Sequence, residues 1–356
     1  MAPVTPPVKP MLAKAVHELP PGDEGDLIFE PKWDGFRCII FRDGDEVELG
    51  SRNQRPFTRY FPELIDPVRE QFPDRAVIDG ELVVPGSDGL DFDALGQRIH
   101  PAESRVNMLA EATPASFVAF DLLSLGDENL MEEPFAQRRR LLEDVAADFS
   151  SPFLLTKSTT DRTLAQEWFE RFEGAGFDGV MAKPADGAYV EDKRVLFKVK
   201  QQKTADCVVA GYRIHKSGDG VGSLLLGAND DDGNLRHLGV ASSFKAADRP
   251  LLLEKLSELH LDDVGEHPWG GWASQTAETA DGSMPGGPNR WNAQKDMSWI
   301  PIAPVLVAEV RYEHATGGRF RGVARLSRWR PDRDPASCHV SQLDHGVPDE
   351  IREIFG

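Results

Sequence analysis

The amino-acid sequence predicts an α+β protein of two domains, the second of which is a small β-barrel of the OB type. Its 356 residues exceed the usual size of a single domain, so two separate cores are expected. Predicted strands and helices are interspersed up to residue 203, whereas five short strands with one helix between the third and the fourth follow it. We therefore expect domains at residues 1–203 and 204–333, and a tail at residues 334–356 with a short helix from Pro348.

The elements of the first domain carry recognisable local signals. Asp43-Gly44 is a hairpin turn between two strands, and Pro134 lies near the first turn of a helix. The predicted strands cover residues 26–30, 36–41, 46–50, 76–84, 116–123, 177–184 and 195–200, and the predicted helices cover residues 62–71, 90–100, 134–147 and 163–174.

Two of these strands carry like charges two residues apart, which places both charges on one face of the strand. Asp79 and Glu81 flank Gly80, and Lys198 and Lys200 flank a valine. Two carboxylates on one face are costly unless they meet a metal, a base or water. These faces are therefore either exposed to solvent or functional.

The second domain is predicted from short apolar runs. Residues 262–292 are rich in Gly, Ser and Pro, so we expect a long loop inserted in the barrel. Residues 229–234 indicate a hairpin loop, because their oxygen ligands lack the spacing of a calcium loop. The expected strands cover residues 207–214, 223–227, 235–241, 305–312 and about 321–329, and the expected helix covers residues 246–259.

Composition and cysteine content favour a cytoplasmic protein, which we expect to be a monomer. No apolar run is long enough to span a membrane, and residues 1–10 are proline-rich without the apolar core of a signal peptide. Cys38, Cys207 and Cys338 are too few and too scattered for a disulfide framework or a zinc cluster, which fits a reducing compartment.

The net charge of −19 argues at first against a nucleic-acid partner, since phosphate binding depends on Lys and Arg. The distribution of charge matters more than the sum. Residues 193–203 contain five basic residues and no acid, and residues 311–333 contain seven arginines against two acids. These runs predict two basic patches for a polyanion, with solvated strand faces as the alternative.

Lys32 is the candidate nucleophile, because an apolar strand is expected to turn a corner there. A lysine attacks only when its amine is neutral, so its pKa must be lowered by burial, nearby cations or a metal. Asp34 follows two residues later, Gly35 permits a tight turn, and Arg37 returns to the same side if a strand resumes. The alternative is a polar hairpin with a surface Lys-Asp pair.

In order and composition, several segments together resemble the ATP-dependent DNA ligases of the lysine-nucleotidyltransferase superfamily, and within them the short two-domain bacterial C-type ligases. The resemblance extends over residues 10–333 and implies a nucleotidyltransferase domain, an ATP-grasp-like adenylation domain, followed by an OB-fold domain. The matching segments are Lys32-Trp33-Asp34-Gly35-Phe36-Arg37, Ser51-Arg52-Asn53, Asp79-Gly80-Glu81, Phe120, Asp178-Gly179-Val180-Met181-Ala182-Lys183, Lys198 with Lys200, and Arg330-Pro331-Asp332-Arg333.

The resemblance implies a catalytic set, a DNA-binding pair and a metal site. Lys32 becomes adenylated, with Asp34, Lys198 and Lys200 as the other catalytic residues. Ser51 and Arg52 hold the 5′ phosphate at a nick. The metal ligands implied are Glu81 and Asp178, although the family more often has glutamate at the position of Asp178.

The resemblance also implies a set of nucleotide contacts. Glu30 contacts the adenine and Arg37 the ribose, while Glu81 lies at the ribose or the metal. Phe120 stacks on the adenine, a contact of about 1–3 kcal/mol by the usual magnitudes of base stacking. The remaining contacts are Lys183, at a phosphate or the adenine, and Arg330.

The reaction that the resemblance implies uses ATP with Mg²⁺ or Mn²⁺ and seals 5′-phosphate/3′-hydroxyl nicks in duplex DNA, in DNA repair. Lys32 takes AMP, the AMP moves to the 5′ phosphate, and the 3′ hydroxyl then displaces it. Lys198, Lys200 and the metal are expected to lower the pKa of Lys32, and a hinge is expected at residues 201–205. The alternatives are an RNA ligase or another lysine nucleotidyltransferase, and a non-catalytic DNA-end-binding protein.

Overall fold

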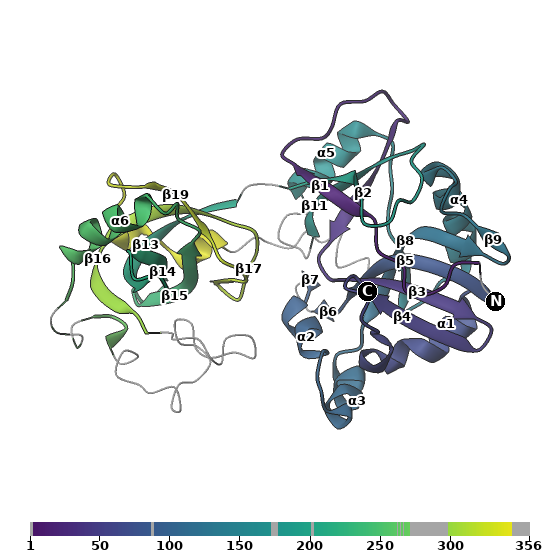
Figure 1. The fold of residues 1–356 in the computed structure, drawn as a ribbon, viewed down its shortest axis with the longest axis horizontal. Coiled ribbons are helices and arrows are strands. Elements are labelled where there is room, and N and C mark those ends of the chain that lie inside the picture. Colours follow the sequence, from purple (N-terminus) through teal and green to yellow (C-terminus); the bar gives the residue numbers. More distant parts are fainter. Residues whose placement is uncertain are drawn as a thin grey trace. The chain divides into compact units, whose positions relative to one another are not determined.

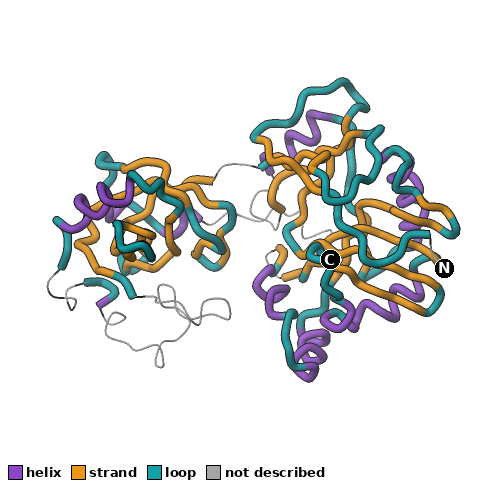
Figure 2. Tube along the Cα trace, in the orientation of Figure 1, coloured by secondary structure: helices purple, strands orange, loops and turns teal. Residues whose placement is uncertain are grey.

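The computed structural model describes residues 3–86, 89–171, 177–200, 203–261, 263, 265, 267–270 and 298–343. These residues form two compact units, one that extends to residue 200 and one that runs from residue 203 to residue 343 (Figure 1). Helices and strands occur in both units (Figure 2), and each unit has its own apolar core. This is the α+β organisation that the sequence predicts.

The first unit contains a four-stranded sheet with the order β1-β12-β11-β2. β1 runs parallel to β12, and the other neighbours are antiparallel. β2 continues through Lys32 to Trp33, which pairs with Phe177, so Lys32 lies within a strand and not at the corner after it. The strands are β1 (Leu12–Val16), β2 (Leu27–Trp33), β11 (Phe177–Pro184) and β12 (Arg194–Val199), and α5 (Arg162–Arg171) packs on this sheet.

A second sheet in the same unit has the order β10-β8-β5-β3-β4, with β9 paired to β8. Side chains of β3 alternate between two apolar clusters. Ile39 and Phe41 pack with Leu196 of the first sheet, whereas Cys38 and Ile40 face the main core. The strands are β3 (Phe36–Asp43), β4 (Glu46–Ser51), β5 (Arg75–Val83), β8 (Ser116–Leu125), β9 (Glu128–Asn129) and β10 (Phe153–Leu155).

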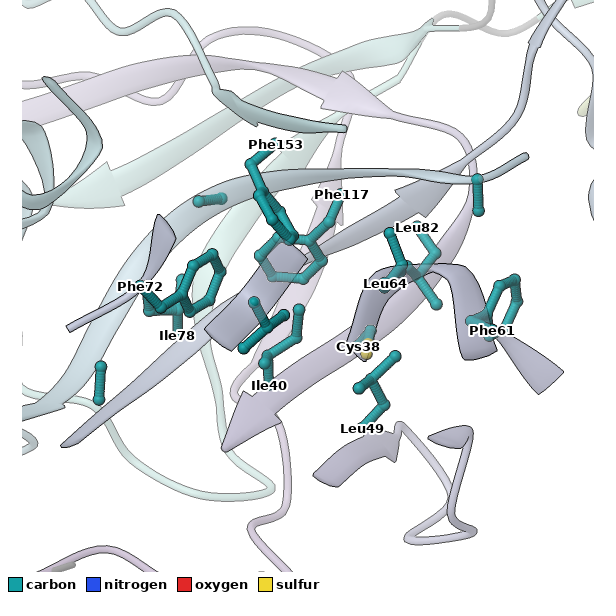
Figure 3. Packing of buried hydrophobic residues seen from close by; sticks show 14 of the residues in the cluster. Cys38, Ile40, Leu49, Phe61, Leu64, Phe72, Ile78, Leu82, Phe117 and Phe153 are labelled. Carbon is teal, nitrogen blue, oxygen red and sulfur yellow. The ribbon is translucent and has the colours of Figure 1, made fainter. Parts of the chain in front are cut away.

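The main core lies on the face of the second sheet that does not meet the first sheet. Figure 3 shows Phe117 and Phe153 packed with Phe72, Ile40 and Ile78 in this core. The helices of this part are α1 (Ile65–Gln71), α2 (Phe92–Gln97), α3 (Glu103–Ala112) and α4 (Phe135–Val145), and the short strands β6 (Pro85–Gly86) and β7 (Gly89–Leu90) form a small ribbon.

Several elements were not predicted from the sequence, and β1 and α3 are the longest of them. α3 buries only Val106 and Leu109, so its apolar stripe is too sparse to stand out. β1 follows a proline-rich start and has no fully buried residue, and its pairing with β12 is a contact distant in sequence. Among the described residues, none of the helices combines the length and the apolar character needed to cross a membrane.

The second unit is a five-stranded sheet with the order β15-β14-β13-β16-β19, consistent with an OB fold. α6 follows β15 and buries Leu252 and Leu256 in the core, as expected for the one helix between the third and fourth strands. The elements are β13 (Lys203–Ile214), β14 (Val221–Asn229), β15 (Leu235–Ser242), α6 (Asp248–Ser257), β16 (Ile300–Tyr312), β17 (Ala315–Thr316), β18 (Arg319–Phe320) and β19 (Arg325–Trp329).

Two of the predicted segments fall wholly or largely outside the described residues. The helix expected from Pro348 and most of the loop expected at residues 262–292 belong to this group. Within that loop His267 and Trp269 are described, and both side chains are buried against the sheet of the second unit.

His237 of β15 is a buried titratable side chain in this unit. Its side chain is 7% exposed, its Nδ1 lies 3.1 Å from Arg319 Nη2, and its ring packs edge-on against Trp269. Burial, together with the guanidinium groups of Arg319 and Arg213, lowers the pKa of His237 to about 3. The folded chain therefore holds this imidazole neutral.

We predict that His237 makes the second unit sensitive to acid. Below pH 6.5 the unfolded state binds a proton that the folded state does not bind until about pH 3, so the free energy of unfolding falls as the pH drops. The loss from this group is about 2 kcal/mol between pH 6.5 and pH 5. Urea unfolding at pH 7 and pH 5 measures it, and His237→Gln should lack it while His260→Gln keeps it. The same pH dependence in His237→Gln as in the wild type would contradict this assignment.

Candidate active site

Lys32 forms an ion pair with Asp178 of the neighbouring strand β11. Lys32 Nζ lies 2.9 Å from Asp178 Oδ2, and the ammonium of Lys200 pairs with the same oxygen. The side chains of Lys32 and Lys200 are each 20% exposed, and that of Asp178 is 9% exposed. One carboxylate thus brings together two lysines that the sequence assigns to one site.

A bulge in β11 holds Asp178 in this position. The pairing of β11 with β2 shifts its register between Phe177 and Val180. Gly179 within the bulge has a φ of +109°, and a Cβ atom at this residue would lie 2.0 Å from the carbonyl oxygen of Val199. Because only glycine tolerates both the conformation and the contact, Gly179 sets the course of the chain beside Asp178.

The protein groups around Lys32 do not by themselves lower its pKa, although the sequence led us to expect that Lys198, Lys200 and a metal would. Burial lowers the pKa of Lys32, but the carboxylates of Asp178 and Glu81 more than offset burial and raise it above its ordinary value. The expectation counted the nearby cations and left out the carboxylate that pairs with Lys200. The neighbouring groups of the protein therefore favour the ammonium form of Lys32.

Glu81 of β5 lies beside the Lys32 segment because the chain approaches β5 closely at Gly35. The Gly35 N–H donates to Glu81 Oε1 at 3.1 Å, and a Cβ atom at Gly35 would lie 2.1 Å from the carbonyl oxygen of Leu82. Removal from water raises the pKa of Glu81 to about 7, against the opposing effect of Lys32 and Arg37. Glu81 is thus a carboxyl group that gains from a cation placed next to it.

Arg37 of β3 is fixed by Asp79 and Phe120. Its Nε lies 2.5 Å from Asp79 Oδ1 and its Nη2 lies 2.6 Å from Asp79 Oδ2, and the Asp79 side chain is fully buried. The guanidinium carbon is 4.4 Å from the centroid of the Phe120 ring. Arg37, Asp79 and Phe120 therefore form one cluster of direct contacts.

Glu30 and Lys183 form a second ion pair, which is almost fully buried. Lys183 Nζ lies 2.7 Å from Glu30 Oε2 and donates to the Phe120 carbonyl at 3.1 Å. Burial lowers the pKa of Lys183, although Glu30 and Asp121 act in the opposite direction. Lys183 Nζ is also 4.6 Å from the Phe120 ring centroid, so this ring lies beside two cations, Lys183 and Arg37.

Two arginines of α4 also pair with carboxylates of this region, and the sequence analysis assigned them no role. Arg139 Nη1 lies 3.2 Å from Glu30 Oε1, and Arg138 makes a bidentate ion pair with Asp121, next to Phe120, at 2.7 and 3.0 Å. Phe135, Arg138, Arg139 and Leu142 are all buried. Their i, i+3, i+4, i+7 spacing is that of a core-facing stripe, and this signal could have identified both arginines.

The structure also places the remaining residues assigned to the first unit. Lys198 lies opposite Met181, which in turn lies opposite Glu30, so the three residues form one row across the sheet. Ser51 is buried at the end of β4, where its Oγ accepts the N–H of Arg55 at 3.0 Å, and Arg52 is exposed just beyond it. Asp34 is half-buried beside Lys32 and contributes to the raised pKa of that lysine.

Arg330 belongs to the second unit, where carboxylates surround its guanidinium. Asp206 and Glu309 lie opposite each other on β13 and β16, an arrangement that needs cations nearby. Arg330 Nη1 is 3.0 Å from both oxygens of Asp206, and its Nη2 is 2.7 Å from Asp332. Arg328 pairs with Glu309 at 2.7 Å, so part of the basic patch predicted at residues 311–333 is neutralised by acids outside it.

Two protein-family models match the sequence of this chain. The model of the ATP dependent DNA ligase domain matches residues 10–200, and that of the ATP dependent DNA ligase C terminal region matches residues 217–333. The fold and the matched regions define a nucleotidyltransferase of the ligase type. The chain belongs to the ATP-dependent DNA ligase family.

Individual relatives agree with this assignment over nearly the whole chain. DNA ligase C2 of Mycolicibacterium smegmatis is 57% identical and covers 96% of each chain. DNA ligase C of Mycobacterium tuberculosis is 53% identical and covers 99% of this chain and 98% of its own. A solved Lig E DNA ligase structure, 18% identical with a TM-score of 0.55, covers 90% of this chain and 99% of its own, and supports the fold alone. The chain is thus one of the short bacterial ATP-dependent DNA ligases.

We predict that Asp178 keeps Lys32 protonated in the nucleotide-free protein. Asp178→Asn removes the carboxylate that raises the pKa of Lys32 and leaves burial, which lowers it. Lys32 should then react about tenfold faster at pH 8 with a neutral amine-reactive reagent, in the absence of ATP and metal. Mass spectrometry of the peptide that contains Lys32 measures the rate.

Asp192→Asn is the matched control, because it removes the surface carboxylate that pairs with Lys9 and should leave Lys32 unchanged. Unaltered reactivity of Lys32 in Asp178→Asn would show that another group holds its proton.

Proposed function

We propose that this chain seals 5′-phosphate/3′-hydroxyl nicks in duplex DNA through a covalent Lys32-AMP intermediate. The observation that carries the proposal is the position of Lys32 in β2, paired with Asp178 and close to Lys200 and Glu81. A protein that only bound DNA ends would gain nothing from a lysine partly buried among carboxylates, because such burial is costly. Relatives at 57% and 53% identity are named DNA ligases, which supports the same activity here.

Lys32 Nζ is the nucleophile of the first step. The amine loses a proton and attacks the α-phosphorus of ATP, an N–P bond forms, and pyrophosphate leaves in line with the attack. Lys198 and Lys200 stabilise the negative charge that develops at the α-phosphate. A phosphate oxygen would offer Lys200 a new partner, and a metal at Asp178 would compete with Lys32 for this carboxylate, which favours the neutral amine.

The nucleoside would be held by the two residue clusters described above, that of Arg37 with Asp79 and Phe120 and that of Glu30 with Lys183. Glu30 and Phe120 contact the adenine, and Arg37 contacts the ribose. Lys183 contributes by holding Glu30 and the Phe120 carbonyl in place, at 2.7 and 3.1 Å. The cluster of ion pairs around this nucleoside site supports these roles, since each assigned side chain is oriented by a charged neighbour.

Glu81 and Asp178 would hold Mg²⁺ or Mn²⁺ together with the triphosphate. Among the described residues no group of three or more His, Cys, Asp or Glu side chains could hold a metal by itself. Mg²⁺ is usually bound by one or two carboxylates and substrate phosphates, and the raised pKa of Glu81 fits a carboxyl group that favours a nearby cation. When bound, the metal would supply positive charge at the reacting phosphate.

Ser51 and Arg52 would bind the 5′ phosphate of the nick in the second and third steps. Arg52 is exposed at the end of β4, with Ser51 beside it, which leaves the guanidinium accessible to a DNA phosphate. The AMP then moves from Lys32 to this phosphate, and the 3′ hydroxyl of the nick attacks it and releases AMP.

The second unit would act on both substrates. Arg330 and its neighbours would bind the pyrophosphate in the first step and later the duplex backbone. Residues 201 and 202 of the hinge expected at residues 201–205 lie outside the described residues. We accordingly assign the adenylation domain to residues 1–203 and the OB-fold domain to residues 204–333, on either side of this junction. We place the activity in the cytoplasm as a monomer, since ATP and chromosomal DNA are present there and one chain supplies every residue assigned.

We predict that α-labelled ATP labels the protein covalently and that Lys32→Ala abolishes the label. Lys32→Arg should abolish it as well, because a guanidinium keeps the charge but is not a nucleophile at neutral pH. Denaturing gel electrophoresis after incubation with Mg²⁺ measures the label. Lys157→Ala, a change at an exposed lysine of the same unit, should retain full labelling. A labelled Lys32→Ala protein would place the nucleophile at another residue.

We predict that Arg52→Ala separates adenylation from sealing. Self-labelling should stay within about twofold of the wild type, while sealing of a nick should fall at least about tenfold, since one charge-assisted contact to the 5′ phosphate is lost. Both rates are measured on the same preparation, with Arg69→Ala as a control for loss of a surface arginine. Equal losses in the two assays would contradict the assigned role.

A further inference from the structure

Tyr189 lies in the loop between β11 and β12, and the function proposed above assigns no role to it. Its side chain is 4% exposed and packs with Met11, Ile39 and Leu196. Its backbone N–H donates to the Met131 carbonyl at 2.7 Å. A buried tyrosine hydroxyl needs hydrogen-bond partners, and the partners of this one point to a role at the nucleotide.

The Tyr189 hydroxyl is bound to Asp79. It donates to Asp79 Oδ2 at 2.6 Å and accepts the N–H of Met11 at 3.2 Å. Asp79 Oδ2 also accepts from Arg37 Nη2, and Asp79 Oδ1 accepts from Arg37 Nε. Burial and the Asp79 charge raise the pKa of Tyr189 well above its ordinary value, so the hydroxyl remains a donor.

Arg37 is consequently held on one edge and one face. Nε and Nη2 are used on Asp79, so the Nη1 edge points away from this carboxylate, and the guanidinium lies 4.4 Å from the Phe120 ring centroid. A guanidinium fixed in this way presents its remaining edge over a narrow range of directions. If Arg37 contacts the ribose, as in the proposed function, this direction selects the ribose hydroxyl that it reaches.

We propose that Tyr189 is a positioning residue that makes the chain prefer ATP to its deoxyribose analogues, because it fixes Asp79 and, through Asp79, Arg37. The inference rests on the proposed function, in which Arg37 contacts the ribose. Tyr189 itself touches no substrate. Its contribution is a hydroxyl that orients the carboxylate behind the ribose-contacting arginine.

Tyr189→Phe tests the proposal, because it removes one hydroxyl and keeps the ring in its apolar cluster. Self-labelling with α-labelled ATP, 2′-deoxyATP and 3′-deoxyATP gives an apparent KM for each nucleotide. In Tyr189→Phe the KM for ATP should rise about tenfold. The ratio of the KM of the better of the two deoxyribose analogues to the KM of ATP should fall by a similar factor. The sealing rate on a nick that already carries AMP should stay that of the wild type.

Two comparisons separate positioning from general structural damage. Tyr60→Phe is the matched control, since it removes the hydroxyl of a half-buried tyrosine of the same unit and should keep the wild-type preference. In an Arg37→Ala background, Tyr189→Phe should have no further effect on the preference, because Tyr189 acts only through Arg37.

Several results would overturn the proposal. They are an equal loss with all three nucleotides, a persistent effect in the Arg37→Ala background, slower sealing of the adenylated nick, and loss of the fold of Tyr189→Phe in thermal melting. A wild-type protein that labels equally with ATP and both analogues would overturn it too. A wild-type protein that no nucleotide labels would instead reject the proposed function and this inference together, so the two failures are distinguishable.

Discussion

The ion pair of Lys32 with Asp178 is the interaction on which the organisation of the site depends. A lysine that is to attack phosphorus must be partly removed from water, and an ammonium in that environment requires a carboxylate partner. Asp178 meets this requirement for Lys32 and Lys200 at once. These two ion pairs compensate the charges of both lysines and hold Lys32 as an ammonium. In the proposed reaction the amine can lose its proton only when Asp178 takes another cation as its partner, and the metal proposed at Glu81 and Asp178 would be such a cation.

The requirement that each buried charge has a partner of opposite charge also applies to the two arginines of α4. Arg138 and Arg139 are adjacent on α4, but they bind carboxylates on different sheets, Asp121 on β8 and Glu30 on β2. Removal of one member of a buried pair leaves an uncompensated charge that costs about 3–5 kcal/mol. One helix thus joins the two sheets through charges that neither sheet can leave unpaired. These two ion pairs of α4 therefore fix the position of Glu30 relative to Phe120.

The sequence predicted those parts of the fold that depend on local patterns. Alternating strands around Ile39 and the shared face of Asp79 and Glu81 follow from a period of two, and the structure has both. The Lys32–Asp178 pair did not follow, because it needs a bulge at Gly179 that only the pairing of β11 with β2 reveals. Tyr189 gave no signal, since its partner Asp79 lies 110 positions away in the chain.

The overall acidity of the chain is related to the way in which its functional cations are paired. Arg330 and Arg328 of the second unit are held by Asp206 and Glu309, as Lys32 is held by Asp178 in the first. A phosphate that binds such a cation must displace a carboxylate, so the net gain is smaller than that of binding to an unpaired cation. The free energy needed to displace the carboxylate is the same for every phosphate. Only a phosphate whose oxygens match the geometry of the cation offsets it with new hydrogen bonds. A net charge of −19 is then compatible with phosphate substrates, and it favours those of the right shape over polyanions in general.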